Sequence, residues 1–239
     1  MNIEILMKPA GSELHRHKVA DHFNPGHQWL LISSILIIML IASCENSSTL
    51  KNSDANLISL NQFDPCDNPD AEITCCFANM ADTLSNVMNI AKPNEPGEPL
   101  LIRGIVFQTD GKTPYADVII YAYHTDHTGH YAKKGNEMGI QKWHGHLHGW
   151  CKTDRNGQYE IHSIRPSPYP DNTIPAHIHA AVREPDGTEP CYITDFVFKD
   201  DSLVDENYIA SLMGAGGTGV VNLTKKANET WIGQRDIVL

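Results

Sequence analysis

Short runs rich in β-branched and aromatic residues, separated by turn-forming residues, fill the chain from about residue 97 to its end. One pair flanks the turn sequence DRNG, with Gly145–Thr153 before it and Gln158–Ile164 after it. Such spacing is typical of antiparallel sheets, because each strand returns beside the previous one through a tight turn. The sequence therefore predicts an all-β sandwich or barrel over residues 97–239. The other expected strands are Leu100–Phe107, Ala116–Thr125, Ala176–Glu184, Cys191–Phe198, Gly219–Leu223 and Trp231–Leu239.

An uncharged apolar run, Trp29–Ser43, lies well before this region. It is short for a bilayer span of about 20 residues but suits the apolar part of an export signal. The run ends in IASC, which resembles the lipobox of bacterial lipoprotein signals and implies that Cys44 carries a lipid. We therefore expect residues 1–43 to be a lipoprotein-type signal peptide. The mature protein would then be exported and membrane-anchored through the lipid, facing the periplasm or the cell surface. An uncleaved membrane anchor is the alternative.

Residues 44–96 are rich in Asn, Ser, Asp and Pro, which predicts a flexible tether with a possible short helix at Asn79–Ile90. The chain has 6 cysteines. If Cys44 carries a lipid, an odd number remains, which allows two disulfides and one free thiol with the pairing open. The remaining cysteines are Cys66, Cys75, Cys76, Cys151 and Cys191.

The charge balance limits the kinds of partner. A formal net charge of -11, from 18 basic and 29 acidic residues, argues against a nucleic acid, because phosphate backbones require a Lys- and Arg-rich surface. A small molecule fits this composition better.

Two histidines and two tyrosines suggest a metal centre. His177 and His179 are expected on one strand and point to the same face, so they could share a metal, although such a pair is also often a polar patch. Tyr169 lies between two prolines shortly before them, and Tyr131 ends a loop. Phenols ionise near ~10, so two phenolates beside two neutral imidazoles make sense next to a strongly charged, hard ion. Ferric iron is the natural choice.

Three segments carry a family resemblance: GEPLLIRGIVFQTDGKTPYADVIIYAYHTDHTGHY, GWCKTDRNGQYEIHSIRPSPYP and PAHIH. Over about Gly97 to Asp200 the chain resembles the intradiol ring-cleavage dioxygenases, which include protocatechuate and catechol dioxygenases. The resemblance implies a β-sandwich with a mononuclear non-haem Fe(III) that uses O2 to cleave a catechol-type ring between its two hydroxyl-bearing carbons. It also implies the metal ligands Tyr131, Tyr169, His177 and His179, with Tyr169 acting as a catalytic base.

One position departs from the family pattern. An arginine commonly precedes the PAHIH element in the ring-cleaving enzymes, and Ile174 stands there in this chain. A preorganised cation that stabilises developing negative charge can contribute orders of magnitude in rate. Arg165 lies in the family's own IRP element, which leaves Arg183 as a weak candidate for a replacement. The alternative function is therefore a non-catalytic metal- or ligand-binding sandwich at the cell surface.

A second histidine cluster lies in the sequence WHGHLHGW, where His144, His146 and His148 are spaced by two. A solvated strand face is the favoured interpretation, and a pocket lined by His146 or His148 is the alternative. The nearby aromatic residues are expected in the core: Tyr121, Tyr123, Trp143 and Trp150. A homo-oligomer is possible, through sandwich surfaces or the tether.

Overall fold

The structure is a computed structural model that describes residues 64–239 except residues 213 and 228. The described residues lie in one compact unit, Ile58–Leu239. The expected signal peptide and Cys44 lie outside them. Within the described part of the chain, no helix is both long enough and apolar enough to span a bilayer.

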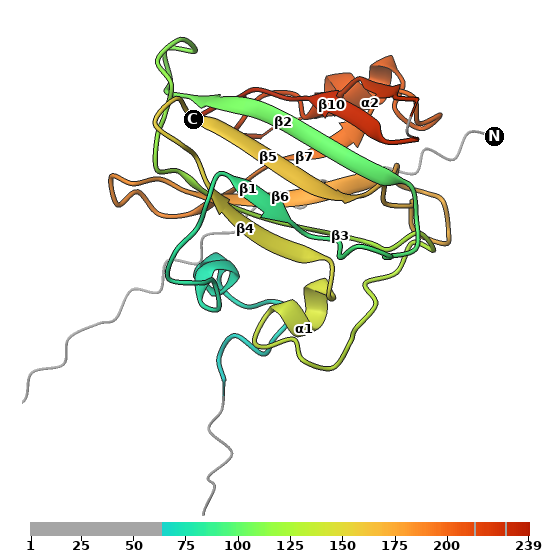
Figure 1. Ribbon diagram of the computed structural model, residues 1–239, viewed down its shortest axis with the longest axis horizontal. Coiled ribbons are helices and arrows are strands. Elements are labelled where there is room, and N and C mark those ends of the chain that lie inside the picture. The colour runs from blue at the N-terminus through green and yellow to red at the C-terminus, as the bar shows by residue number, and fades with distance from the viewer. Residues whose placement is uncertain (1–63, 213, 228) are drawn as a thin grey trace, which may run out of the picture. The chain divides into compact units, whose positions relative to one another are not determined.

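Two packed sheets form the unit and confirm the all-β class (Figure 1). The first sheet has the order β1-β5-β2-β10-β9, with β11 also paired to β2, and the second has the order β4-β3-β6-β7-β8. The strands of the first sheet are β1 (Val87–Asn89), β2 (Pro99–Phe107), β5 (Gln158–Ile164), β9 (Leu223–Lys225), β10 (Trp231–Gln234) and β11 (Ile237–Val238). Those of the second are β3 (Ile119–His124), β4 (His148–Lys152), β6 (His177–Arg183), β7 (Cys191–Phe198) and β8 (Val220–Val221).

The core lies between the sheets because the strand residues alternate in direction. On β6, Ile178 and Ala180 are fully buried and belong to the main core cluster. Their neighbours His177 and His179 therefore project from the opposite, outer face of the second sheet. On β3, Tyr123 is paired with His179 on one side and His148 on the other, so these three residues share the outer face.

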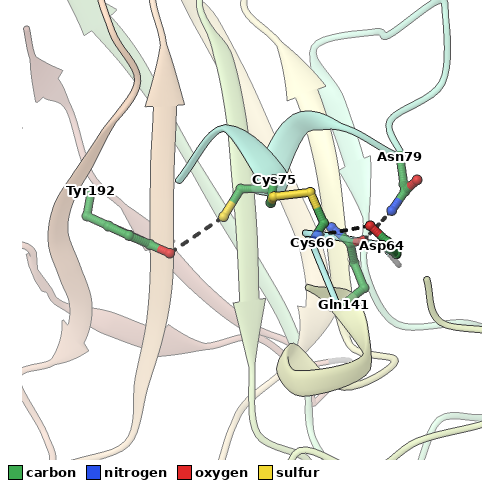
Figure 2. Close-up of a disulfide and its surroundings, with 7 residues drawn as sticks. Asp64, Cys66, Cys75, Asn79, Gln141 and Tyr192 are labelled. Atoms are coloured by element: carbon green, nitrogen blue, oxygen red, sulfur yellow. Dashed lines mark hydrogen bonds between the residues drawn. A yellow bond between two sulfur atoms is a disulfide. The ribbon is translucent and has the colours of Figure 1, made fainter. Parts of the chain in front are cut away.

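A short helical segment covers part of this outer face. The 3-10 helix η1 (Ile73–Phe77) is joined to the preceding loop by the disulfide Cys66–Cys75, which Figure 2 shows. It packs Cys76 and Phe77 against Tyr121 of β3. The helix α1 (Gln141–His144) contributes Ile140, the residue before it, to the same cluster. A further helix, α2 (Glu206–Ser211), begins at Asp205, whose carboxylate accepts a hydrogen bond from the Tyr208 backbone N–H.

The predicted helix at Asn79–Ile90 is wrong. The strand β1 lies there and runs parallel to β5, with Val87 opposite Glu160. Met88 and Ile90 are buried, and their spacing of two is the period of a strand rather than a helix. These residues belong to the first sheet instead of a flexible tether.

The cysteine count allows two disulfides, and one is present among the described residues. The described residues contain the bond Cys66–Cys75 and three free thiols, at Cys76, Cys151 and Cys191. Cys151 lies on β4 and Cys191 on β7, with β3 and β6 between them. Three interstrand spacings of about 4.8 Å place these cysteines too far apart for a disulfide.

The alternation on β6 gives a stability prediction. Replacing Ile178, which is fully buried, with alanine should lower the free energy of unfolding by about 2–5 kcal/mol, because it leaves a cavity between the sheets. The matched control is Ile174→Ala, since that side chain is 42% exposed and should cost about 0.5 kcal/mol or less. Urea unfolding of both variants measures the difference, and equal losses would contradict the placement of β6.

Candidate metal centre

Four side chains converge at one end of β6. The Tyr131 and Tyr169 hydroxyl oxygens are 2.8 Å apart, and Tyr169 Oη lies 3.3 Å from His177 Nε2. His177 Nε2 is 3.0 Å from His179 Nε2, which is 3.0 Å from Tyr131 Oη. The four polar atoms thus form a closed ring of contacts. The structure brings together all the residues that the sequence suggested as metal ligands.

The two tyrosines reach this point on two loops that are held together. The Thr125 hydroxyl donates to the Ser167 carbonyl at 2.7 Å, and the Ser167 hydroxyl donates to the His127 carbonyl at 2.8 Å. Gly129 has a φ of +83°, and a Cβ there would lie 2.2 Å from the Pro168 carbonyl oxygen. Only glycine permits this approach, so Gly129 allows the Tyr131 loop to lie against the Tyr169 loop.

Hydrogen bonds outside the ring set the protonation of both histidines. His177 Nδ1 lies 2.7 Å from the Pro175 carbonyl oxygen, and His179 Nδ1 lies 2.9 Å from Asp195 Oδ1. Each Nδ1 therefore carries the proton, and each Nε2 presents a lone pair to the centre of the ring. Burial lowers the pKa of His177, and the neighbouring His179 lowers it further. Two lone pairs 3.0 Å apart are suited to share a cation.

The surroundings of the tyrosine hydroxyls also favour a bound cation. Burial raises the pKa of Tyr131 well above its ordinary value, and the hydrogen bond with Tyr169 raises it further. A phenolate at this position therefore requires a strongly charged partner. The donor set of two phenols and two imidazoles matches a hard ion that accepts nitrogen ligands.

Asp195 is a site residue that the sequence reasoning missed. It is the only charged residue within β7, Cys191–Phe198, and this isolated charge in an apolar strand was the available signal. The carboxylate is also close enough to His177 and His179 for the three to hold a metal. Because Asp195 accepts from His179 Nδ1, it acts here as the group that orients the imidazole.

Aromatic rings pack against the candidate ligands. Tyr123 stacks on His179 with 4.7 Å between ring centroids and on His144 with 3.6 Å. Tyr121 is fully buried, and its hydroxyl lies 2.9 Å from His144 Nδ1. Tyr121 is in the core as predicted, whereas Tyr123 forms part of the wall of the metal centre. Trp143 was expected in the core but is 44% exposed, because it lies on α1 with the Lys133 ammonium 5.2 Å from its ring centroid.

The second histidine cluster does not form a strand face. His144 belongs to α1, His146 lies in the following loop, and β4 begins at His148. His144 is buried under Tyr123, so the solvated interpretation is wrong for this residue. His146 and His148 do line a pocket, but the four candidate ligands are not among its lining residues.

Neither Arg165 nor Arg183 is free to replace the cation expected at Ile174. The Ile174 side chain is exposed. Arg165 makes two hydrogen bonds with Asp200, at 2.8 and 2.9 Å, and stacks on Trp231. Arg183 stacks on Phe77, so both arginines are engaged outside the metal centre.

Comparisons with known proteins agree with this geometry. The family model described as Dioxygenase matches residues 74–235, which is more than half of the chain. The chain belongs to the intradiol ring-cleavage dioxygenase family. A chlorocatechol 1,2-dioxygenase of Rhodococcus opacus is 29% identical over 133 residues, which cover 48% of this chain and 49% of that protein. The chain thus spans about half the length of this relative.

Solved structures share the fold. The dioxygenase domain of a dioxygenase carbohydrate-binding protein fusion from Streptomyces sp. SirexAA-E matches with a TM-score of 0.50 and 23% identity. This match covers 63% of the present chain and 85% of the other. A 3-chlorocatechol 1,2-dioxygenase from Rhodococcus opacus has a TM-score of 0.48 and 22% identity, over 64% of this chain and 63% of that one. The match to the dioxygenase domain of the fusion protein identifies this β-sandwich as the intradiol dioxygenase fold.

The close approach at Gly129 can be tested. A Gly129→Ala variant should push the two loops apart and separate Tyr131 from Tyr169, because the added Cβ has no room beside Pro168. We expect ferric iron bound per chain to fall at least tenfold, while the urea midpoint shifts little because the loops are on the surface. Gly135→Ala is the matched control, since it also has a positive φ but has nothing within 4 Å of an added Cβ. Full iron loading of Gly129→Ala would refute the role of this contact.

The hydrogen bond from His179 to Asp195 gives a second test. Asp195→Asn should weaken metal binding by about 10–100-fold, because the amide is a poorer acceptor for the Nδ1 proton. Chelator competition measures this affinity without any turnover. Asp186→Asn is the control, since Asp186 is exposed and accepts from the Thr188 backbone N–H. An unchanged affinity in Asp195→Asn would show that the carboxylate does not support the ligand.

Proposed function

We propose that this protein is a non-haem Fe(III) dioxygenase that cleaves a catechol-type ring between its two hydroxyl-bearing carbons. The observation that carries the proposal is the ring formed by Tyr131, Tyr169, His177 and His179, in which each polar atom lies 2.8 to 3.3 Å from the next. Family membership supports the same activity. In the overall reaction the ring C–C bond breaks, and both atoms of O2 end in the two carboxyl groups of the product.

The protein's own groups have distinct parts in this proposal. His177 and His179 would hold the ion through Nε2, with their rings fixed by Pro175 and Asp195. Bound ferric iron would supply a Lewis acid that lowers the pKa of the diol and makes the ring reactive toward O2. Tyr169, which is only partly buried, is placed to accept a proton from an entering diol hydroxyl through its phenolate oxygen. Tyr131 would remain as a ligand.

The centre is accessible to a substrate from solvent. His179 retains 23% of its side-chain exposure and Asp195 retains 37%. Ile174 offers an exposed apolar surface on the loop between Tyr169 and His177. The exposed apolar surface at Ile174 suits the ring of an aromatic diol.

We also propose that the protein is exported and anchored in a membrane through a lipid on Cys44. The apolar run and the IASC sequence support this placement. The Cys66–Cys75 disulfide is consistent with it, because disulfides persist in oxidising compartments.

Spectroscopy and oxygen uptake test the proposed activity. Purified protein should show a visible charge-transfer band from tyrosinate to iron, and it should consume O2 with catechol, protocatechuate or hydroxyquinol. Tyr131→Phe should shift and weaken the band, because one phenolate is lost, whereas Tyr115→Phe, whose phenol lies beside Glu184, should leave it unchanged. A colourless protein that retains zinc would refute the iron centre. An iron-loaded protein that consumes no O2 with any of these diols would support the non-catalytic binding alternative.

A further inference from the structure

A pocket of about 320 Å³ lies beside β4 at the edge of the second sheet. It is called the second pocket here, to distinguish it from the candidate metal centre. Its wall includes Ile90 after β1, Gln141 of α1, and His148 and Trp150 of β4. Tyr123 is paired with His148 on one side and His179 on the other, so a strand lies between the pocket and the metal centre. The pocket is therefore a separate feature from the proposed active site.

Two of the charged side chains in this wall, Glu95 and Lys134, are paired with each other, whereas Lys92 is exposed. Glu95 has only 9% of its side chain exposed and contacts Lys134 Nζ at 2.7 Å and His146 Nε2 at 2.8 Å. The Glu137 carboxylate accepts from the backbone N–H groups of Lys134 and Gly135. A charged ligand would have to compete with these pairs, so the interior favours a neutral one.

One polar group in the wall lacks a partner although it is buried. Gln141 is 1% exposed, and its Nε2 has no hydrogen-bond partner among the described residues. Its Oε1 accepts from Asn79 Nδ2 at 2.9 Å, next to the disulfide, as Figure 2 shows. Burial raises the pKa of Tyr121 and a side-chain hydrogen bond with Gln141 lowers it, while the Tyr121 hydroxyl also lies 2.9 Å from His144 Nδ1. The Gln141 amide nitrogen carries two N–H donors, of which at most one can serve Tyr121, so a donor remains unused inside the protein, which is costly.

A complementary acceptor lies in the same wall. His148 Nδ1 is 2.7 Å from the Gly145 carbonyl oxygen, so Nδ1 carries the proton and Nε2 has a free lone pair. Within the described part of the chain, that Nε2 makes no hydrogen bond. Burial lowers the pKa of His148, which keeps the ring neutral. Trp150 packs edge-to-face on this imidazole with 5.2 Å between ring centroids and adds an apolar surface.

A hydroxyl group can accept from an amide and donate to an imidazole through the same oxygen. We propose that this pocket is a binding site for a neutral, ring-shaped molecule that carries hydroxyl groups, with Gln141 Nε2 as donor and His148 Nε2 as acceptor. Two sources share this chemistry: a monosaccharide and an uncharged aromatic diol. The site goes beyond the proposed ring cleavage and does not depend on it.

The test is ligand binding to the purified, chelator-treated full-length chain, so that a diol cannot bind through iron. Isothermal titration with glucose, galactose and catechol should give saturable binding of at least one of them. Gln141→Glu keeps the acceptor for Asn79 but removes the donor, and it should weaken binding about tenfold. His148→Phe should weaken it similarly. The matched control, Gln108→Glu, changes an exposed glutamine outside the pocket and should leave the affinity unchanged.

The outcomes separate the possibilities. Sugar binding without catechol binding identifies a saccharide site, and the reverse identifies a second diol site; both support the proposal provided that Gln141→Glu weakens the binding. Three results would overturn it: no saturable binding of any neutral ligand, equal affinity in Gln141→Glu, or tighter binding of the charged analogues gluconate and protocatechuate. Urea unfolding of each variant identifies any that has lost its fold, and Gln141→Glu remains decisive if His148→Phe fails to fold.

Discussion

The rest of the candidate metal centre depends on the close approach of His177 Nε2 and His179 Nε2. Both ring nitrogens present lone pairs at a separation of 3.0 Å, because Pro175 and Asp195 hold the protons on the other side of each ring. Such an arrangement is unfavourable unless a positive charge is shared between them. The remainder of the fold can be understood as the support that keeps this pair in place. The strand β6 fixes the direction of the rings, and the core anchors β6 through Ile178 and Ala180.

The tyrosines depend on a different kind of support. They come from loops, and loops hold a geometry only when hydrogen bonds and close packing restrict them. Here Thr125, Ser167 and Gly129 link the two loops directly. The centre therefore combines one rigid half, on a strand, with one half that depends on contacts between loops. An exchangeable ligand such as the proposed Tyr169 base is well placed on the second half.

Most of the strands and the four candidate ligands could be predicted from the sequence, because the signals for them lie in short stretches of the chain. Period-two alternation revealed the strands and the shared face of His177 and His179, and the family resemblance supplied Tyr131 and Tyr169. The sequence did not reveal Asp195 as the partner of His179, because their pairing depends on a register between β6 and β7 that contains a shift. It also failed for β1, which is short and stabilised by parallel pairing to β5, far along the chain. His144 was misjudged because a helix of one turn ends at this residue, before the strand begins.

The disulfide has a consequence for when the molecule becomes complete. Cys66–Cys75 holds the segment that carries Asn79, and Asn79 holds Gln141 at the second pocket. This bond forms only where thiols can be oxidised. A newly made chain in a reducing compartment would have the sandwich core but would lack the covalent link on its outer face. The covalent support of this side of the second pocket therefore forms only in an oxidising compartment, whereas the histidine pair on β6 is held by the core and by hydrogen bonds to Pro175 and Asp195.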